Sequence, residues 1–167
     1  VYEFDAHGVD LNQRYRSGAI VTDGAAEPAY ERDPQLHYQA TCWPGARLPH
    51  IWLYTADGRK ASTLDLAGKG RFTLFTGIGG DGWAQAAAAL NEQWQLDVAV
   101  RTVGPRQAWQ DFTGDWARAR EVEDSGALLV RPDQHVAWRS RTRSDDPLAE
   151  LRRVLGQILA RQPWRVR

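Results

Sequence analysis

Residues 72–103 read FTLFTGIGGDGWAQAAAALNEQWQLDVAVRTV, and this stretch decides the fold. Phe72–Thr76 is a short run of β-favouring residues that ends at a glycine, which predicts a buried strand. Gly77–Gly82 predicts a tight turn, with Asp81 placed to cap the helix that follows. Apolar residues then recur at helical spacing on one face: Trp83, Ala86, Ala87, Leu90 and Trp94. Leu96–Val103 returns as a second strand, so the stretch predicts a β-α-β unit.

Two further elements follow the β-α-β unit. Ala127–Arg131 and His135–Arg139 flank Pro132-Asp133, where proline favours a type I turn, so these residues predict a β-hairpin. Asp146-Pro147 supplies a cap followed by proline at the first helical position. The helix after it carries an apolar stripe: Leu148, Leu151, Leu155, Ile158 and Leu159. Residues 104–126 predict only a short or irregular helical connection, because their apolar pattern is weak.

This order of elements is the thioredoxin-like arrangement, an α/β fold with a mixed sheet and flanking helices. A β-α-β unit joins two parallel strands through a right-handed crossover. We therefore expect the Phe72–Thr76 strand to be central and parallel to the Leu96–Val103 strand, with the hairpin antiparallel. Seven residues are expected in the core: Trp83, Leu90, Val98, Val100, Leu129, Leu151 and Leu155.

Residues 1–53 are predicted to form a long irregular arm, and residues 54–167 the thioredoxin-like domain. Residues 22–50 are rich in Pro, Gly, Asp and His, which is typical of irregular chain. The arm also carries apolar side chains without a helix or strand period: Tyr15, Ile20, Val21, Tyr30, Tyr38 and Trp43. An exposed apolar surface usually marks an interface, so we expect the arm to contact another domain or subunit.

Four residues at the end of the arm are the candidate interface residues: Arg47, Pro49, His50 and Trp52. Arginine presents a planar fork of donors that suits a carboxylate or backbone carbonyls across such a contact. We expect Arg47 to take this role.

Composition narrows the class of partner. The 21 Lys and Arg residues balance the 21 Asp and Glu residues, so no net field attracts nucleic acid or an anionic membrane. No apolar run approaches the roughly 20 residues that span a bilayer, and no secretory signal opens the sequence. We expect a cytoplasmic protein with no nucleic-acid or membrane partner. Methionine is absent, also at position 1, so we expect Val1 to be the end of a processed or excised chain.

The sequence shows no catalytic constellation. Thioredoxin redox chemistry needs Cys-x-x-Cys between the first strand and its helix, where this chain has Gly77–Gly82. Cys42 is the single cysteine and is predicted to be a small buried residue. No serine lies in a G-x-S-x-G elbow. Four histidines are scattered without the spacing of metal ligands: His7, His37, His50 and His135. We expect no catalytic, cofactor-binding or metal-binding residue.

The glycine turn also spells G-x-G-x-x-G between a strand and a helix, which is the context of a dinucleotide site. A helix N-terminus at that place favours a pyrophosphate. Against this interpretation, Val100–Gly104 at the end of the next strand offers no acidic residue for a ribose. A tight turn fits better. An independent small-ligand or nucleotide-binding module that uses Gly77–Gly82 remains the alternative.

Five stretches that run through nearly the whole chain carry a family resemblance. They are HGVDLNQRYRS (7–17), PGARLPHIWL (44–53), STLDL (62–66), GRFTLFTG (70–77) and LVRPDQHVAWR (129–139). These stretches resemble the C-terminal part of FAD-dependent aromatic-ring hydroxylases, in the phenol and 2,4-dichlorophenol 6-monooxygenase branch.

The resemblance implies a parent enzyme that uses FAD and NADPH to hydroxylate a phenol ortho to its hydroxyl group. It also implies that this chain is a thioredoxin-like C-terminal domain without redox cysteines, which serves packing and assembly. Its partners would be the flavin domain of the parent and, in a homo-oligomer, further copies of the enzyme. The flavin fingerprint and the substrate pocket of the family lie upstream, so no cofactor is expected to bind this chain.

Overall fold

The central sheet has four strands in the order β4-β3-β5-β6. It is seen in a computed structural model that describes residues 6–161, so the expected processed end at Val1 lies outside the described residues. β3 (Thr73–Thr76) runs parallel to β4 (Ala99–Thr102) and antiparallel to β5 (Ala127–Val130), which pairs antiparallel with β6 (Val136–Ser140). The predicted thioredoxin-like mixed sheet is confirmed, with the expected Phe72–Thr76 strand, now β3, in a central position. β4 begins three residues later than expected.

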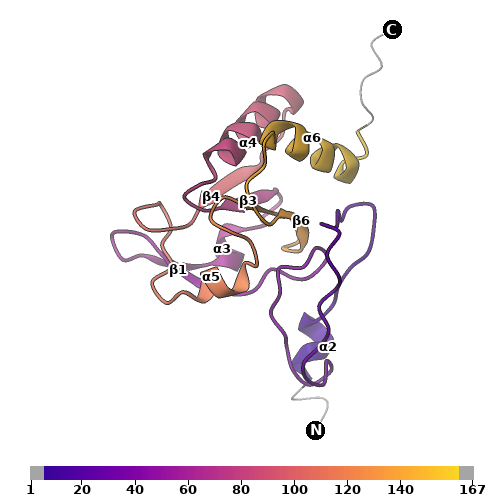
Figure 1. Ribbon diagram of the computed structural model, residues 1–167. Helices are drawn as coiled ribbons and strands as arrows, with labels where there is room; N and C mark the ends of the chain where they lie inside the picture. The colour runs from indigo at the N-terminus through magenta and orange to yellow at the C-terminus, as the bar shows by residue number, and fades with distance from the viewer. Residues whose placement is uncertain (1–5, 162–167) are drawn as a thin grey trace.

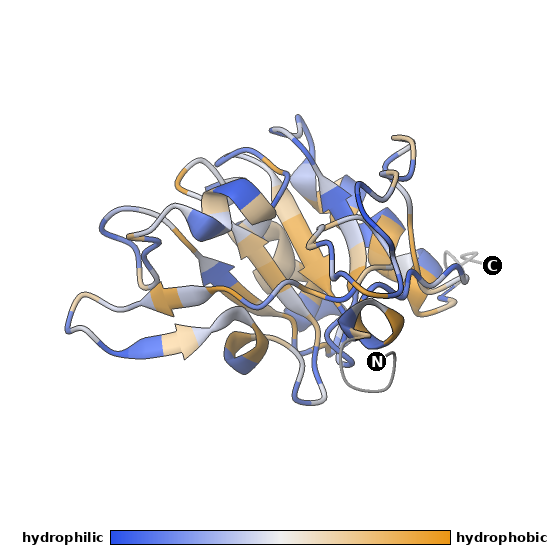
Figure 2. Ribbon diagram, turned by 90° about the horizontal axis from the view of Figure 1, so that it is seen from below, coloured by the Kyte–Doolittle hydropathy of each residue, from blue (hydrophilic) through white to orange (hydrophobic). Residues whose placement is uncertain are grey.

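The two faces of this sheet each carry a hydrophobic cluster, because successive strand residues point to opposite sides. Leu74 and Leu129 contact the helices α4 (Asp81–Trp94) and α6 (Pro147–Ile158), which pack against each other. Phe75 belongs to the cluster on the other face. Figure 1 shows α4 and α6 together on one side of the sheet, with α3 (Thr63–Leu66) and α5 (Asp115–Ala119) on the other. In Figure 2 the central strands are largely hydrophobic and the surrounding loops largely hydrophilic.

Of the seven expected core residues, six are at least 97% buried: Trp83, Leu90, Val98, Leu129, Leu151 and Leu155. The seventh, Val100, is half-buried and packs against the same cluster. It is less covered because β4 is an edge strand, with β3 on one side only.

The sequence predicted two N-terminal helix caps, and the structure contains one of them. Asp146 caps α6 as predicted: its Oδ1 accepts the backbone N–H of Ala149 at 2.9 Å, and Pro147 is the first helical residue. The prediction that Asp81 caps α4 is wrong, because Gly80 takes the cap position and Asp81 is already helical. In the first turn its carboxylate still interacts favourably with the positive end of the helix dipole.

The structure also contains a small hairpin, followed by a short helix, that was not predicted from the sequence. β1 (Trp52–Tyr54) pairs antiparallel with β2 (Lys60–Ser62), and α3 follows directly. Ser62 and Asp65 form a reciprocal capping box at the start of α3. The domain boundary expected after residue 53 therefore falls inside β1. The connection between β4 and β5 holds only the five-residue helix α5, as predicted.

The end of the arm, residues 41–51, packs along the open edge of β6. Gly45 donates its backbone N–H to Val136 at 2.7 Å, and Val136 donates to Ala46 at 2.9 Å. Gly45 has a φ of +102°, and a Cβ there would lie 2.2 Å from the carbonyl oxygen of Tyr15, so only glycine fits. An uncovered edge strand invites unwanted pairing with other chains. We name residues 41–51 the arm base, because they complete the sheet.

Three of the six apolar residues of the arm are covered within this chain and do not form an exposed surface. Ile20, Val21 and Trp43 are each 7% exposed and are buried within this domain. Val21 donates its backbone N–H to Ala137 in β6 at 2.8 Å, which anchors it there. Three residues remain on the surface, at 47%, 36% and 36% exposure: Tyr15, Tyr30 and Tyr38.

Candidate interdomain interface in the N-terminal arm

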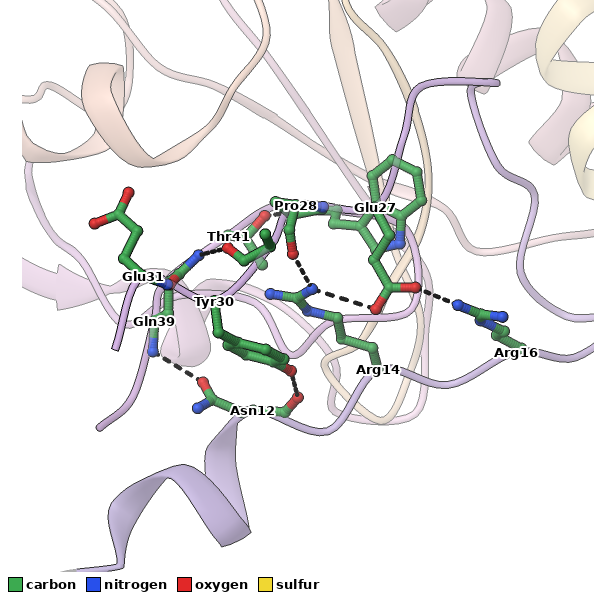
Figure 3. A network of polar contacts seen from close by, with 11 residues as sticks. Asn12, Arg14, Arg16, Glu27, Pro28, Tyr30, Glu31, Gln39 and Thr41 are labelled. Carbon is green, nitrogen blue, oxygen red and sulfur yellow. Dashed lines mark hydrogen bonds and ion pairs between the residues drawn. The ribbon is translucent and has the colours of Figure 1, made fainter. Parts of the chain in front are cut away.

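Residues 6–40, named here the arm tip, are held together by polar contacts around Asn12 (Figure 3). The Asn12 side-chain amide donates to the carbonyl oxygens of Pro34 at 2.8 Å and His37 at 2.7 Å. Its Oδ1 accepts the backbone N–H of Gln39 at 2.8 Å, and its own carbonyl oxygen accepts the hydroxyl of Tyr30, also at 2.8 Å. α2 (His7–Leu11) leads into this cluster. Asn12 thus organises the arm tip in place of an apolar core.

Two arginines share one carboxylate in the arm tip. Arg14 has only 6% of its side chain exposed, and it donates to Glu27 at 3.2 Å and to the carbonyl oxygen of Pro28 at 2.5 Å. Its guanidinium also lies 4.1 Å from the centre of the Tyr30 ring. Arg16 pairs with the other oxygen of Glu27 and is 85% exposed. The hydrogen bond from Arg16, assisted by Arg14, holds the pKa of Glu27 below its ordinary value.

A pocket of about 380 Å³ lies where the arm tip meets the arm base. Tyr15, Ile20 and Trp43 give it apolar walls, while Arg16 and Glu27 bring charge to it. Three smaller side chains complete the lining: Ser17, Thr22 and Pro44. This volume falls in the range of small ligand sites and also holds one or two protein side chains.

Beside this pocket, a buried ionic cluster joins the arm to the sheet. Arg139 of β6 is 4% exposed, and its Nε donates to Asp23 Oδ2 at 2.8 Å. Its Nη1 donates to Glu121, whose other oxygen accepts the backbone N–H of Cys42 at 3.2 Å. Burial alone raises the pKa of Asp23, but the hydrogen bond from Arg139, the backbone N–H of Ala25 and the charge of Arg139 together outweigh it and lower the pKa. The Arg139 guanidinium also lies 5.4 Å from the centre of the Trp43 ring.

Cys42 is fully buried in this region. Burial raises the pKa of its thiol well above the ordinary value, and the carboxylate of Glu121 raises it further. A thiol of this kind stays protonated and is a poor nucleophile.

The four predicted interface residues lie on one segment but in different surroundings. Arg47 is half-buried and forms a backbone bridge with His135, and its guanidinium makes no hydrogen bond or ion pair within residues 6–161. Burial raises the pKa of the nearby Tyr38 to about 12, an effect that the charge of Arg47 only partly offsets. Pro49 is buried, and its carbonyl oxygen accepts the hydroxyl of Thr63 at 2.5 Å.

His50 and Trp52 are exposed and contact each other edge to face, with ring centres 4.7 Å apart. Trp52 is 42% exposed, and the Lys60 ammonium lies 3.9 Å from the centre of its ring. Tyr54 is on the same side of β1 because strand residues alternate, and it contacts Phe112, which is 67% exposed. The exposed side of the β1–β2 hairpin is therefore aromatic, and only two of the four predicted residues contribute to it.

The glycine turn has its own packing explanation. A Cβ on Gly77 would lie 2.7 Å from the Cα of Asp124 and 2.8 Å from its carboxylate oxygen. Ser125 lies next to Gly79 and accepts the indole N–H of Trp83 at 3.0 Å. The place from which a pyrophosphate would approach Gly77 is thus filled by chain that carries a carboxylate. The turn does not fit FAD or another dinucleotide.

Residues 6–161 contain no group of three or more His, Cys, Asp or Glu side chains placed to hold a metal ion. No helix in the part that the structure describes has the length and apolar character needed to cross a membrane.

The ionic clusters of the arm were missed by sequence reasoning. Arg14 and Glu27 are 13 residues apart, and Arg139 and Asp23 are 116 apart. Such separations follow no helix or strand period. The residues that anchor the arm could therefore be identified only from the three-dimensional structure.

Comparison with known proteins identifies the family. Residues 41–161 match the family described as the aromatic-ring hydroxylase C-terminal domain. The chain is 50% identical to the 2,4-dichlorophenol 6-monooxygenase of Cupriavidus pinatubonensis strain JMP 134, over 98% of this chain and 27% of the relative. It is 47% identical to the phenol 2-monooxygenase of Pseudomonas sp. strain EST1001, over 92% of this chain and 25% of the relative. The chain thus spans about a quarter of these relatives' length.

Solved structures agree with the sequence relatives. The flavin-dependent monooxygenase PieE, in complex with FAD and substrate, superposes with a TM-score of 0.85 at 51% identity, over 95% of this chain and 27% of PieE. Aklavinone-11 hydroxylase with FAD and aklavinone superposes with a TM-score of 0.76 at 32% identity, over 89% of this chain and 26% of that one. The chain therefore belongs to the C-terminal domain family of the aromatic-ring hydroxylases.

Proposed function

We propose that this chain is the non-catalytic C-terminal domain of a cytoplasmic, FAD- and NADPH-dependent monooxygenase that hydroxylates a phenol. The observation that carries this proposal is the identity of 50% to a 2,4-dichlorophenol 6-monooxygenase over nearly the whole chain. The chain covers only 27% of that relative, so the remaining length supplies the room for flavin and substrate. In this role the domain packs against the flavin domain and supports assembly.

Three features support a role without chemistry of its own. The thiol of Cys42 is fully buried, with a raised pKa. The glycine turn is packed against Asp124 and Ser125. The charged groups of Arg14, Glu27, Arg139 and Asp23 are engaged in ion pairs that hold the arm.

Two contacts are proposed for the assembled enzyme. The flavin domain of the same polypeptide is the first partner, reached through the N-terminal arm, while the thioredoxin-like unit includes all of β1 and so begins before residue 54. A neighbouring subunit of a homo-oligomer is the second. Among the candidate interface residues, His50 and Trp52 offer the exposed aromatic side of the β1–β2 hairpin to that subunit. Pro49 is buried and Arg47 is half-buried in the same segment. The Arg47 guanidinium makes no hydrogen bond or ion pair within residues 6–161, which suits it to pair with a carbonyl or carboxylate of the partner.

The proposal is tested by comparing the 167-residue chain with the full-length enzyme. The chain alone is expected to show no visible flavin spectrum, no thermal shift with FAD or NADPH, and no phenol-dependent NADPH consumption. The full-length enzyme is expected to show a flavin spectrum, a thermal shift with FAD and NADPH, and phenol-dependent NADPH consumption. Stoichiometric flavin in the isolated chain would refute the non-catalytic role, and a full-length protein without flavin would refute the family function.

A further inference from the structure

We infer that the arm tip, residues 6–40, is the surface on which the flavin domain docks, and that the 380 Å³ pocket at its root receives a side chain from that domain. The inference rests on the proposed function, because it takes the flavin domain to be the remainder of the polypeptide. It goes further by naming the surface and the chemistry of the contact.

The arm tip has no hydrophobic interior of its own. Between residues 6 and 40 the buried apolar side chains are Ile20 and Val21: Val21 packs into the core cluster of the domain, and Ile20 lines the pocket. What holds the tip is the set of hydrogen bonds around Asn12 and the ion pairs of Glu27. Net contributions of such bonds are about 1 kcal/mol each, which is little for ordering some thirty residues. A segment built in this way is suited to gain further stability from a partner surface.

The position of the arm tip along the chain also points to the flavin domain. The match to the family model begins at residue 41, so the arm tip precedes the part of the chain that this model covers. About three quarters of the length of the relatives also lies outside the matched region. If the flavin domain precedes this one, as proposed, the polypeptide enters the described structure through the arm tip. Figure 1 shows β1 at the left and α2 near the bottom of the molecule, so we assign the arm tip and the aromatic hairpin side to different partners.

The pocket combines apolar walls with charge at its edge. Its walls include the rings of Tyr15 and Trp43, whereas Arg16 at its edge is 85% exposed. Glu27 already neutralises the buried Arg14, so the pair of arginines keeps one positive charge in excess of Glu27. The matching partner is an apolar side chain flanked by a carboxylate or a backbone carbonyl.

The experiment places the photo-cross-linker p-benzoylphenylalanine at Ser17, an exposed residue of the pocket lining, in the full-length holoenzyme. The matched control carries the same group at Ala88, which is exposed on α4. Irradiation of the Ser17 variant is expected to give a cross-link within one polypeptide, mapped by mass spectrometry to the flavin domain. The yield should not depend on protein concentration. The Ala88 variant is expected to give no cross-link to that domain.

A charge reversal provides an independent test. Arg16→Glu in the Ser17 cross-linking background is expected to reduce the yield at least about tenfold, because opposed like charges at an interface are costly. Arg153→Glu, on the exposed side of α6, is the matched control and is expected to leave the yield unchanged. Cross-linked dimers from Ser17, or an unaffected yield in Arg16→Glu, would overturn the inference. An enzyme that cross-links as expected but holds no flavin would refute the proposed function and leave the surface assignment standing.

Discussion

Arg139 Nε lies 2.8 Å from Asp23 Oδ2, and this contact joins β6 to a part of the arm 116 residues earlier in the chain. Both side chains are nearly inaccessible, at 4% and 8% exposure. Glu121 accepts a second hydrogen bond from Arg139 and also receives the backbone N–H of Cys42. The arm is therefore fixed to the sheet by charge pairing as well as by the strand-like contacts of the arm base.

Arg139→Ala is predicted to lower the free energy of unfolding of the chain by about 3–5 kcal/mol. The reason is that the substitution leaves the carboxylate of Asp23 buried without its partner. Urea unfolding monitored by tryptophan fluorescence measures this. Arg141→Ala, an exposed neighbour on the same segment, is the control and should stay within about 0.5 kcal/mol of the parent chain. Equal effects of the two substitutions would show that the Arg139 cluster does not anchor the arm.

The same pair predicts how stability depends on pH. The folded-state pKa of Asp23 is lowered, so its contribution is fully present above the unfolded value of about 3.9 and is lost as pH falls through the folded value. The difference in unfolding free energy between the parent chain and Asp23→Asn should be constant above about pH 5 and shrink below about pH 4. Urea titrations across this range test it. A difference that grows on acidification would contradict the assigned sign.

The sequence was sufficient for the elements whose pattern is local. The glycine-bounded strand, the alanine-rich helix and the Asp146-Pro147 helix start each carry their signal within a few residues, and the structure contains all three. The β1–β2 hairpin was overlooked although Asp57-Gly58 is a turn signal that follows a short apolar run. Its strands have three residues each, too few for a visible alternation.

The arm could not be predicted in the same way. Its base adds to β6 through backbone hydrogen bonds, which leave no trace in side-chain pattern. Its tip depends on Asn12 bonding to residues 22 to 27 positions away, again without a period. Which apolar residues of the arm are buried and which are exposed could therefore be seen only in the folded structure.

Leu151→Ala is predicted to destabilise the chain by about 2–5 kcal/mol, because Leu151 is completely buried between α6 and the sheet and its loss leaves a cavity. Chemical unfolding measures the change. Arg153→Ala on the exposed side of the same helix should change stability by less than about 0.5 kcal/mol. A loss below that limit for Leu151→Ala itself would mean that the buried face of α6 has been misassigned.

Cys42 is predicted to resist thiol reagents in the folded chain. It is completely buried, and its pKa is raised by burial and by Glu121, so little thiolate is available. Ellman's reagent should react with one thiol per chain in denaturant and with almost none in native buffer. Glutathione under both conditions controls for the reagent. Rapid native-state reaction would show that the arm base opens away from the sheet.

Arg47→Ala separates a role in assembly from a role in folding. The Arg47 guanidinium makes no hydrogen bond or ion pair within residues 6–161, so removing it should change the stability of the isolated chain by less than about 0.5 kcal/mol. In the full-length enzyme the same change is expected to weaken subunit assembly or flavin retention, because a planar donor fork at an interface is lost. Analytical ultracentrifugation and bound-flavin absorbance measure the two effects. Arg47→Lys keeps the charge but not the fork, and it should restore only part of the lost assembly. If Arg47→Ala instead unfolds the isolated chain and leaves assembly of the enzyme intact, Arg47 supports the arm from within and takes no part in an interface.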